Sequence, residues 1–139
     1  MDNSLLILDL MRAFYWFDEQ LRTRLAQRGW PGITRSQSLV LANVANGVVR
    51  PSVIASNLGV SRQAMSQLLG EMSQAGLIDI VPDPDDRRAQ RVVFSSLGGP
   101  IREAASSILR DLEAQLAGAA GRNAVLGLRA ALHAVPQED

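Results

Sequence analysis

Residues 51–75 contain a short helical pattern and a longer one, separated by a very tight turn, and this stretch constrains the fold more than any other. Pro51 opens the first pattern, because a proline at the first helical position removes no donor that the helix needs. Gly59 suits the left-handed conformation that ends this helix, and Ser61 is a good N-cap for a second helix to about Ala75. The sequence therefore predicts a helix-turn-helix, held at a steep angle by an apolar set: Ile54, Ala55, Leu58, Val60, Met65, Leu68, Leu69 and Met72.

The outward face of the second helix has short or planar hydrogen-bonding side chains. These residues are Ser61, Arg62, Gln63, Ser66, Gln67, Gly70 and Gln74, with Glu71 as the acidic exception. Arginine offers two parallel donors to guanine, glutamine offers a donor and an acceptor to adenine, and serine can address a phosphate or a base. This face therefore fits the reading of DNA bases, and a polar face that is simply solvated is the alternative.

A β-hairpin, or wing, is predicted directly after the second helix. Two β-branched runs, residues 77–81 and 91–95, flank a segment rich in Pro and Asp. Arginines cluster at or near its tip (Arg87, Arg88 and Arg91), and an arginine there would enter the minor groove of DNA, where the negative potential is deepest. The aspartates suit turn positions, although Asp86 would alternatively brace a wing arginine by a charge-assisted hydrogen bond. A solvated charge run is the plainer interpretation.

Longer helices are predicted on both sides of this unit. The first covers about residues 4–28, with charged residues such as Asp18 mainly on the side away from its apolar stripe. Leu6, Met11 and Tyr15 widen that stripe, which indicates a second packing surface. The remaining helices are expected at residues 34–47, 96–117 and 123–135, and Thr34 and Gln37 form a capping box at the start of the first of these. The fold class is therefore mainly α with a small β-wing.

Composition excludes much enzyme chemistry. The chain has 139 residues, 47% of them apolar, which is enough for one compact domain. It contains no cysteine and no lysine, so it has neither a cysteine nucleophile nor a phosphate-binding loop, and its one histidine, His133, cannot form a two-histidine zinc site. We therefore expect no catalytic residue, no cofactor and no metal. Without a membrane span or a signal-peptide pattern, we expect a cytoplasmic protein.

Net charge bears on the choice of partner. The chain has 14 basic and 14 acidic residues, and this neutrality counts mildly against nucleic-acid binding. A DNA-binding function therefore requires that the arginines gather locally on one side.

The wing contains the most specific motif of the chain. Asp83-Pro84-Asp85-Asp86-Arg87-Arg88 is followed by Arg91-Val92-Val93-Phe94-Ser95-Ser96-Leu97-Gly98. With the order of the helices, this motif resembles the D-P-x-D-R-R…L-T-x-x-G wing of the MarR (multiple antibiotic resistance regulator) family of bacterial winged-helix transcription factors. The resemblance covers nearly the whole chain. Phe94-Ser95 stands where the family usually has Leu-Thr, which keeps an apolar anchor and a hydroxyl N-cap.

The resemblance implies a set of DNA contacts. Ser61, Arg62, Gln63, Ser66 and Gln67 fall where the recognition helix enters the major groove. Arg88, in an Asp-x-Arg arrangement with Asp86, falls on the wing-tip arginine of the minor groove, and Arg87 is a second contact. The resemblance further implies a homodimer on a pseudo-palindromic operator, usually a repressor released by a small ligand or oxidant. The absence of cysteine excludes sensing by thiol oxidation.

The apolar surfaces independently favour a dimer. We interpret residues 1–139 as a single domain in which residues 33–96 form the winged helix-turn-helix and residues 1–32 and 97–139 form dimerisation helices. The outer helices have more apolar surface than that unit can cover, and pairing two chains would bury it. Packing within one chain is the alternative. A small aromatic effector would bind near this junction, lined by His133 and aromatic residues that could equally be core: Phe14, Tyr15, Trp16, Phe17 and Trp30.

The sequence thus favours a sequence-specific, DNA-binding transcriptional regulator, acting as a homodimer and responding to a ligand. A winged-helix module that binds proteins rather than DNA is the alternative, since the chain is neutral and acidic residues surround the wing. Binding to duplex DNA across a salt series separates the two. An enzyme is the poorest option.

Overall fold

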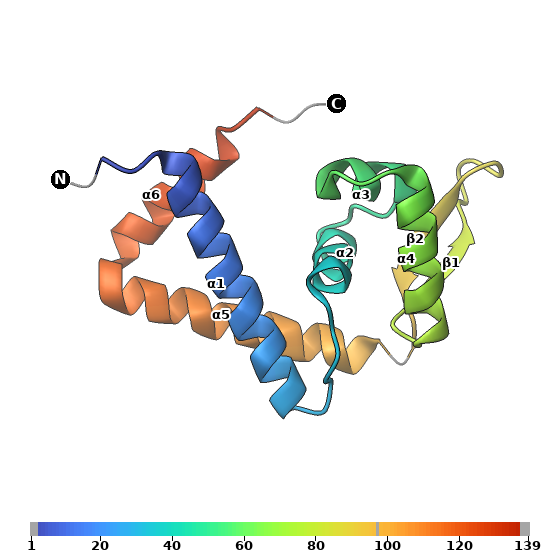
Figure 1. Ribbon diagram of the computed structural model, residues 1–139, viewed down its shortest axis with the longest axis horizontal. Helices are drawn as coiled ribbons and strands as arrows, with labels where there is room; N and C mark the ends of the chain where they lie inside the picture. Colours follow the sequence, from blue (N-terminus) through green and yellow to red (C-terminus); the bar gives the residue numbers. More distant parts are fainter. Residues whose placement is uncertain (1–2, 97, 137–139) are drawn as a thin grey trace.

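The computed structural model describes residues 3–96 and 98–136. It confirms the mainly α fold with a two-stranded wing. The elements in chain order are α1 (Leu6–Gln27), α2 (Arg35–Ala45), α3 (Pro51–Leu58), α4 (Arg62–Gln74), β1 (Ile78–Pro82), β2 (Gln90–Phe94), α5 (Gly99–Ala120) and α6 (Arg122–His133). Figure 1 shows two lobes: α1, α5 and α6 form one, and α2, α3, α4 and the hairpin form the other.

The helix-turn-helix forms for the local reasons that its sequence indicates. Gly59 has φ +70°, in the left-handed region that favours glycine, and ends α3. The Ser61 side chain accepts a hydrogen bond from the Ala64 amide at 3.1 Å and caps α4. The apolar side chains of both helices meet α2 and the hairpin in one core that includes Val40, Val44, Ile54, Ala55, Met65, Leu69, Met72, Ile78 and Val92. Val60, expected in this core, is instead 40% exposed because it lies in the turn.

The hairpin pairs its strands antiparallel, with Ile78 opposite Phe94 and Pro82 opposite Gln90. The first strand starts and ends one residue later than predicted, and the second one residue earlier. Ile78 and Val92 are fully buried, so the inner face of the hairpin completes the core beneath α4. The amide of Val92 also donates to the carbonyl of Val49 at 2.8 Å, which fixes the segment before α3 against the hairpin.

The junction between β2 and α5 differs from the prediction. Ser95 was expected to supply a hydroxyl N-cap, but the N-cap of α5 is Gly98, without a side-chain hydrogen bond. The Ser95 hydroxyl accepts from the Gly98 amide at 2.9 Å and donates to the Gly76 carbonyl, so it stabilises the turn instead. Leu97, predicted on the apolar face of this helix, lies outside the described residues.

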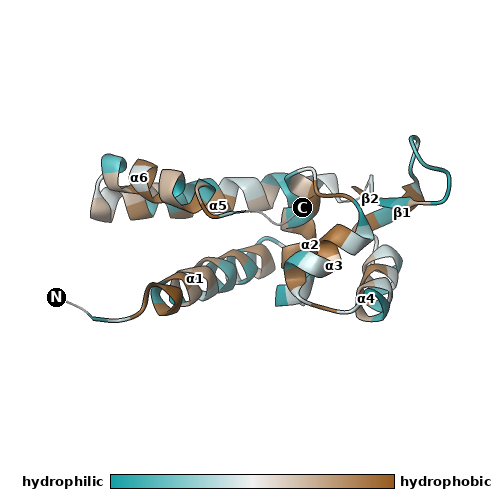
Figure 2. Cartoon of the chain, turned by 90° about the horizontal axis from the view of Figure 1, so that it is seen from above, coloured by the Kyte–Doolittle hydropathy of each residue, from teal (hydrophilic) through white to brown (hydrophobic). Residues whose placement is uncertain are grey.

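A second core joins α1 to α5. Leu25, Ile101, Ala104, Ile108 and Leu112 are buried in it. The opposite end of α1 has exposed apolar side chains, and α6 has no buried residue. Figure 2 shows hydrophobic residues recurring along α1 and α6, whereas the tip of the hairpin is hydrophilic. The large hydrophobic side chains exposed on these two helices and at their ends are Leu5, Leu6, Ile7, Leu8, Leu10, Met11, Phe14, Tyr15, Trp16, Leu126, Leu128, Leu132 and Val135.

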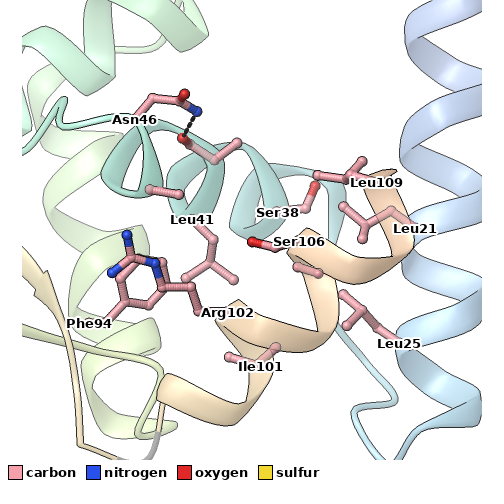
Figure 3. A pocket seen from close by; sticks show the side chains of 13 residues that line it. Leu21, Leu25, Ser38, Leu41, Asn46, Phe94, Ile101, Arg102, Ser106 and Leu109 are labelled. Atoms are coloured by element: carbon pink, nitrogen blue, oxygen red, sulfur yellow. Dashed lines mark hydrogen bonds between the residues drawn. The ribbon is translucent and has the colours of Figure 1, made fainter. Parts of the chain in front are cut away.

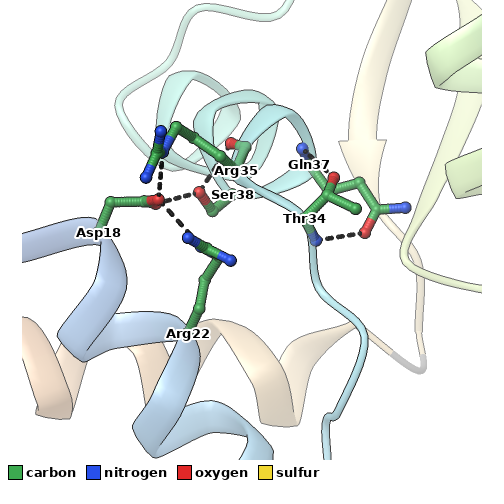
Figure 4. Close-up of polar contacts among 6 residues, drawn as sticks. All are labelled: Asp18, Arg22, Thr34, Arg35, Gln37 and Ser38. Atoms are coloured by element: carbon green, nitrogen blue, oxygen red, sulfur yellow. Dashed lines mark hydrogen bonds and ion pairs between the residues drawn. The ribbon is translucent and has the colours of Figure 1, made fainter. Parts of the chain in front are cut away.

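Asp18 connects the two lobes. It was predicted on the solvated side of the first helix, but it is only 6% exposed. Its carboxylate accepts hydrogen bonds from Arg22 Nε at 2.9 Å, Arg35 Nε at 3.0 Å and Ser38 Oγ at 2.5 Å (Figure 4). Burial alone raises the pKa of Asp18, but the hydrogen bonds from Ser38, Arg35 and Arg22 outweigh it and hold the pKa below its ordinary value. The carboxylate therefore stays ionised and ties α1 to α2.

Candidate nucleic-acid interface

The predicted recognition face is exposed along α4. Met65, Leu69 and Met72 are buried, which fixes the rotation of this helix about its axis. Its opposite side and N-cap present a polar set to solvent: Ser61, Arg62, Gln63, Ser66 and Gln67. The structure therefore brings these five predicted site residues together on one accessible face.

The tip of the wing is shaped by its aspartates. Asp83 Oδ1 accepts from the Asp85 amide at 2.9 Å, which is the turn chemistry predicted for it. Asp86 Oδ1 accepts from the backbone amide of Arg88 at 3.0 Å. The expected bracing of a wing guanidinium by Asp86 is not seen, because Asp86 forms no ion pair within residues 3–96 and 98–136. Arg87 and Arg88 are both exposed.

A groove joins the recognition face to the wing. It has a volume of about 590 Å³, and it is lined by Arg50, Ser52, Arg62, Ser66, Arg87, Arg88 and Gln90 together with the apolar or small residues Pro51, Met65, Leu69, Pro82 and Ala89. Four of these residues are arginines and none is acidic. The overall neutrality of the chain thus hides a local excess of positive charge between α3, α4 and the hairpin.

Arg50 is the groove residue that sequence reasoning missed. The local sequence there indicates only a helix that begins at Pro51, and the ion-pair partner of Arg50 lies 33 residues along the chain. Arg50 Nη2 lies 3.3 Å from Asp83 Oδ2, and the Asp83 side chain is only 9% exposed. The hydrogen bond from the Asp85 amide lowers the pKa of Asp83, partial burial opposes this, and Arg50 lowers the pKa further. Asp83 is therefore a stable anion at neutral pH.

A separate apolar pocket lies between the lobes. It has a volume of about 240 Å³ and is lined by residues of α1, α2, β2 and α5, mostly apolar (Figure 3). Polar groups come from Ser38, Asn46, Arg102 and Ser106, and the Arg102 guanidinium lies 4.9 Å from the centre of the Phe94 ring. The expected pocket residues do not line it: Phe14, Tyr15, Trp16, Phe17, Trp30 and His133.

The described part of the chain has neither a cluster of metal ligands nor a helix suited to a membrane. No cluster of three or more His, Asp or Glu side chains there could hold a metal ion. No helix there combines the length and apolarity that a bilayer crossing requires.

Comparison with known proteins relates the helix-turn-helix segment to one family. The sequence profile of the MarR family matches residues 32–89, which run from the approach to α2 into the wing. Over these residues the chain is similar to the MarR family. The resemblance noted from the wing motif is thereby confirmed, and a search of curated proteins gives no match.

Solved structures extend the MarR likeness to the whole fold. NadR in complex with 4-hydroxyphenylacetate has a TM-score of 0.77 at 19% identity, covering 96% of this chain and 93% of that one. Wild-type MarR from E. coli, in its apo form, has a TM-score of 0.69 at 19% identity, covering 97% and 100%. RV1404 from Mycobacterium tuberculosis has a TM-score of 0.67 at 23% identity, covering 96% and 93%. The outer helices α1, α5 and α6 therefore share this architecture too.

Proposed function

We propose that this protein is a sequence-specific transcriptional regulator that binds double-stranded DNA in the cytoplasm. In this proposal α4 enters the major groove, where Arg62, Gln63 and Gln67 read bases, and Arg88 enters the adjoining minor groove. The observation that supports it most is the common groove: the exposed face of α4 and the wing arginines border one space without an acidic residue. Such a surface matches the phosphate-lined grooves of a duplex.

The first test is to select bound sequences from random duplex DNA and then measure two variants on the selected site. Gln63→Ala should relax the preference at particular base pairs by about 1–3 kcal/mol, because a bidentate contact is lost. Arg88→Ala should weaken binding with a modest loss of discrimination, because the wing supplies mainly electrostatic contact. If both variants keep the full affinity for the operator, the assignment is refuted.

The alternative is a winged-helix module that binds proteins. A salt series on the wild-type protein separates the two, because a DNA reader loses affinity steeply as salt rises. The groove favours DNA over a protein partner, because four arginines along one space suit the row of phosphates on a DNA strand.

We further propose that the regulator is a homodimer. Exposed apolar side chains line α1 and α6, and such a patch is larger than a monomer ordinarily leaves in water. Pairing these helices across a two-fold axis would bury the patch and set two α4 helices about 34 Å apart, one turn of DNA. Analytical ultracentrifugation should give twice the 15.0 kDa mass of the chain, and a stable monomer would refute the dimer.

The pocket between the lobes supports a response to a small aromatic acid. Its walls are mostly apolar, its volume suits a molecule with one ring, and Arg102 supplies a counter-ion for a carboxylate. The ligand of NadR, 4-hydroxyphenylacetate, is of this chemistry. We propose that such a ligand releases the protein from DNA and relieves repression. Calorimetry should detect 4-hydroxyphenylacetate but not neutral 4-methylphenol, and equal heats for both would refute the role of Arg102.

A further inference from the structure

If the protein binds DNA as proposed, the position of the groove between α3, α4 and the hairpin can be compared with that of a single DNA strand. Each sugar–phosphate strand of a duplex separates a major groove from a minor groove. A helix in one groove and a wing in the adjoining groove therefore have one strand between them. In this chain, the space between α4 and the hairpin is the arginine-lined groove.

Arg50 enters this groove from a third element. It is the N-cap of α3, and the neighbouring Val49 carbonyl accepts from the Val92 amide of β2 at 2.8 Å. The backbone of Arg50, from which its side chain starts, is thus fixed relative to the hairpin. The bond to Asp83 Oδ2 at 3.3 Å then orients the guanidinium toward the hairpin.

The ion pair with Asp83 leaves Arg50 free to bind a second anion. A guanidinium has five N–H donors, and the bond to Asp83 is the one that the Arg50 guanidinium makes within the part of the chain that the structure describes. Its length exceeds the ~2.7–2.9 Å typical of charge-assisted bonds. The Arg50 side chain is 53% exposed, so its remaining donors are accessible from the groove.

We infer that this groove holds one sugar–phosphate strand of the DNA and that Arg50 donates to a phosphate oxygen in it. The inference rests on the proposed DNA-binding function and adds a third point of attachment, beside α4 and the wing. Arg50 contacts no base, so it contributes affinity without sequence preference.

The test compares Arg50→Ala with the wild type on the selected operator, by fluorescence anisotropy between about 50 and about 200 mM NaCl. The slope of log K against log salt should become shallower by about 0.9 for each Arg50 engaged, hence about 1.8 for a dimer on two half-sites. The ratio of affinities for the operator and its single-base variants should stay unchanged. Arg110→Ala, which removes an exposed arginine from the middle of α5, is the matched control and should keep the wild-type slope.

The outcomes distinguish this inference from the proposed function. If Arg50→Ala keeps the wild-type slope while Gln63→Ala still loses discrimination, the phosphate contact is wrong and the DNA-binding function stands. If the wild type itself shows no salt-dependent binding, both fall. Arg50→Gln, which keeps the length and polarity of the side chain, should show the same loss of slope. A change in melting temperature alone, without a change in slope, would assign Arg50 a purely structural role.

Discussion

Replacing Asp18 by alanine should destabilise the protein more than the loss of an ordinary helix-surface carboxylate. Asp18 is 6% exposed and accepts one hydrogen bond within α1 and two from α2. Its partners Arg35 and Ser38 belong to α2, the first helix of the lobe that we propose binds DNA. The substitution therefore removes polar attachment between the lobes as well as a buried charge.

The three bonds are not equal. The bond from Ser38 is buried, and a hydrogen bond to a charged group contributes about 1.5–3 kcal/mol. The side chains of Arg22 and Arg35 are 29% and 42% exposed, so they can bind water after the substitution. Each of their bonds then adds on the order of 0.5 kcal/mol, as exposed pairs do. Because removal of the carboxylate also recovers its desolvation cost, the expected net loss is about 2–3 kcal/mol.

The assay is urea unfolding, followed by circular dichroism at one protein concentration so that any dimer contributes equally. Glu19→Ala is the matched control, because Glu19 is the next residue of the same helix and is exposed. It should change the free energy of unfolding by no more than about 0.5 kcal/mol. If Asp18→Ala loses no more than Glu19→Ala does, then the buried carboxylate contributes nothing net, and the reasoning is refuted.

Further predictions concern pH, two glycines and one core residue. The folded-state pKa of Asp18 lies below its ordinary value of 3.8. The ionised Asp18 carboxylate therefore stabilises the folded protein above that pH, and this contribution is lost as pH falls through the folded-state pKa. In urea melts, the stability advantage of the wild type over Asp18→Asn should accordingly shrink below about pH 4. Gly98→Ala places a Cβ 2.6 Å from the Leu77 carbonyl oxygen and should cost about 1–3 kcal/mol in the same melts. Gly70→Ala lies in open space within α4 and should instead add about 0.5–1 kcal/mol; a loss would show that the glycine is required. Met72→Ala removes a fully buried side chain and should cost about 2–5 kcal/mol, measured as a shift of the urea midpoint.

Local signals made the ends of α2, α3 and α4 predictable. The capping box of Thr34 and Gln37 forms as its sequence indicates, with both reciprocal hydrogen bonds present. Ser61 and Gly59 likewise act through atoms within a few residues of themselves. Such features depend only on the adjacent backbone, so a single sequence contains the information that decides them.

Features that depend on distant partners were not predictable. Periodicity assigned Asp18 to solvent, but Arg35 and Ser38 bury it from 17 and 20 residues away. Arg50 meets Asp83 across 33 residues, so no local pattern marked it. In each case the deciding contact is set by how elements pack.

Zero net charge is compatible with DNA binding because affinity depends on local contacts. The chain balances 14 basic against 14 acidic residues, yet the groove between α4 and the wing contains four arginines and no carboxylate. Asp83 is mostly buried and already paired with the groove residue Arg50, so it opposes a phosphate less than a free carboxylate would. Since the salt dependence of binding counts the phosphates that are neutralised, a steep slope is expected from this neutral protein. Long-range steering, in contrast, follows the overall field, so the association rate should be modest for a DNA-binding protein.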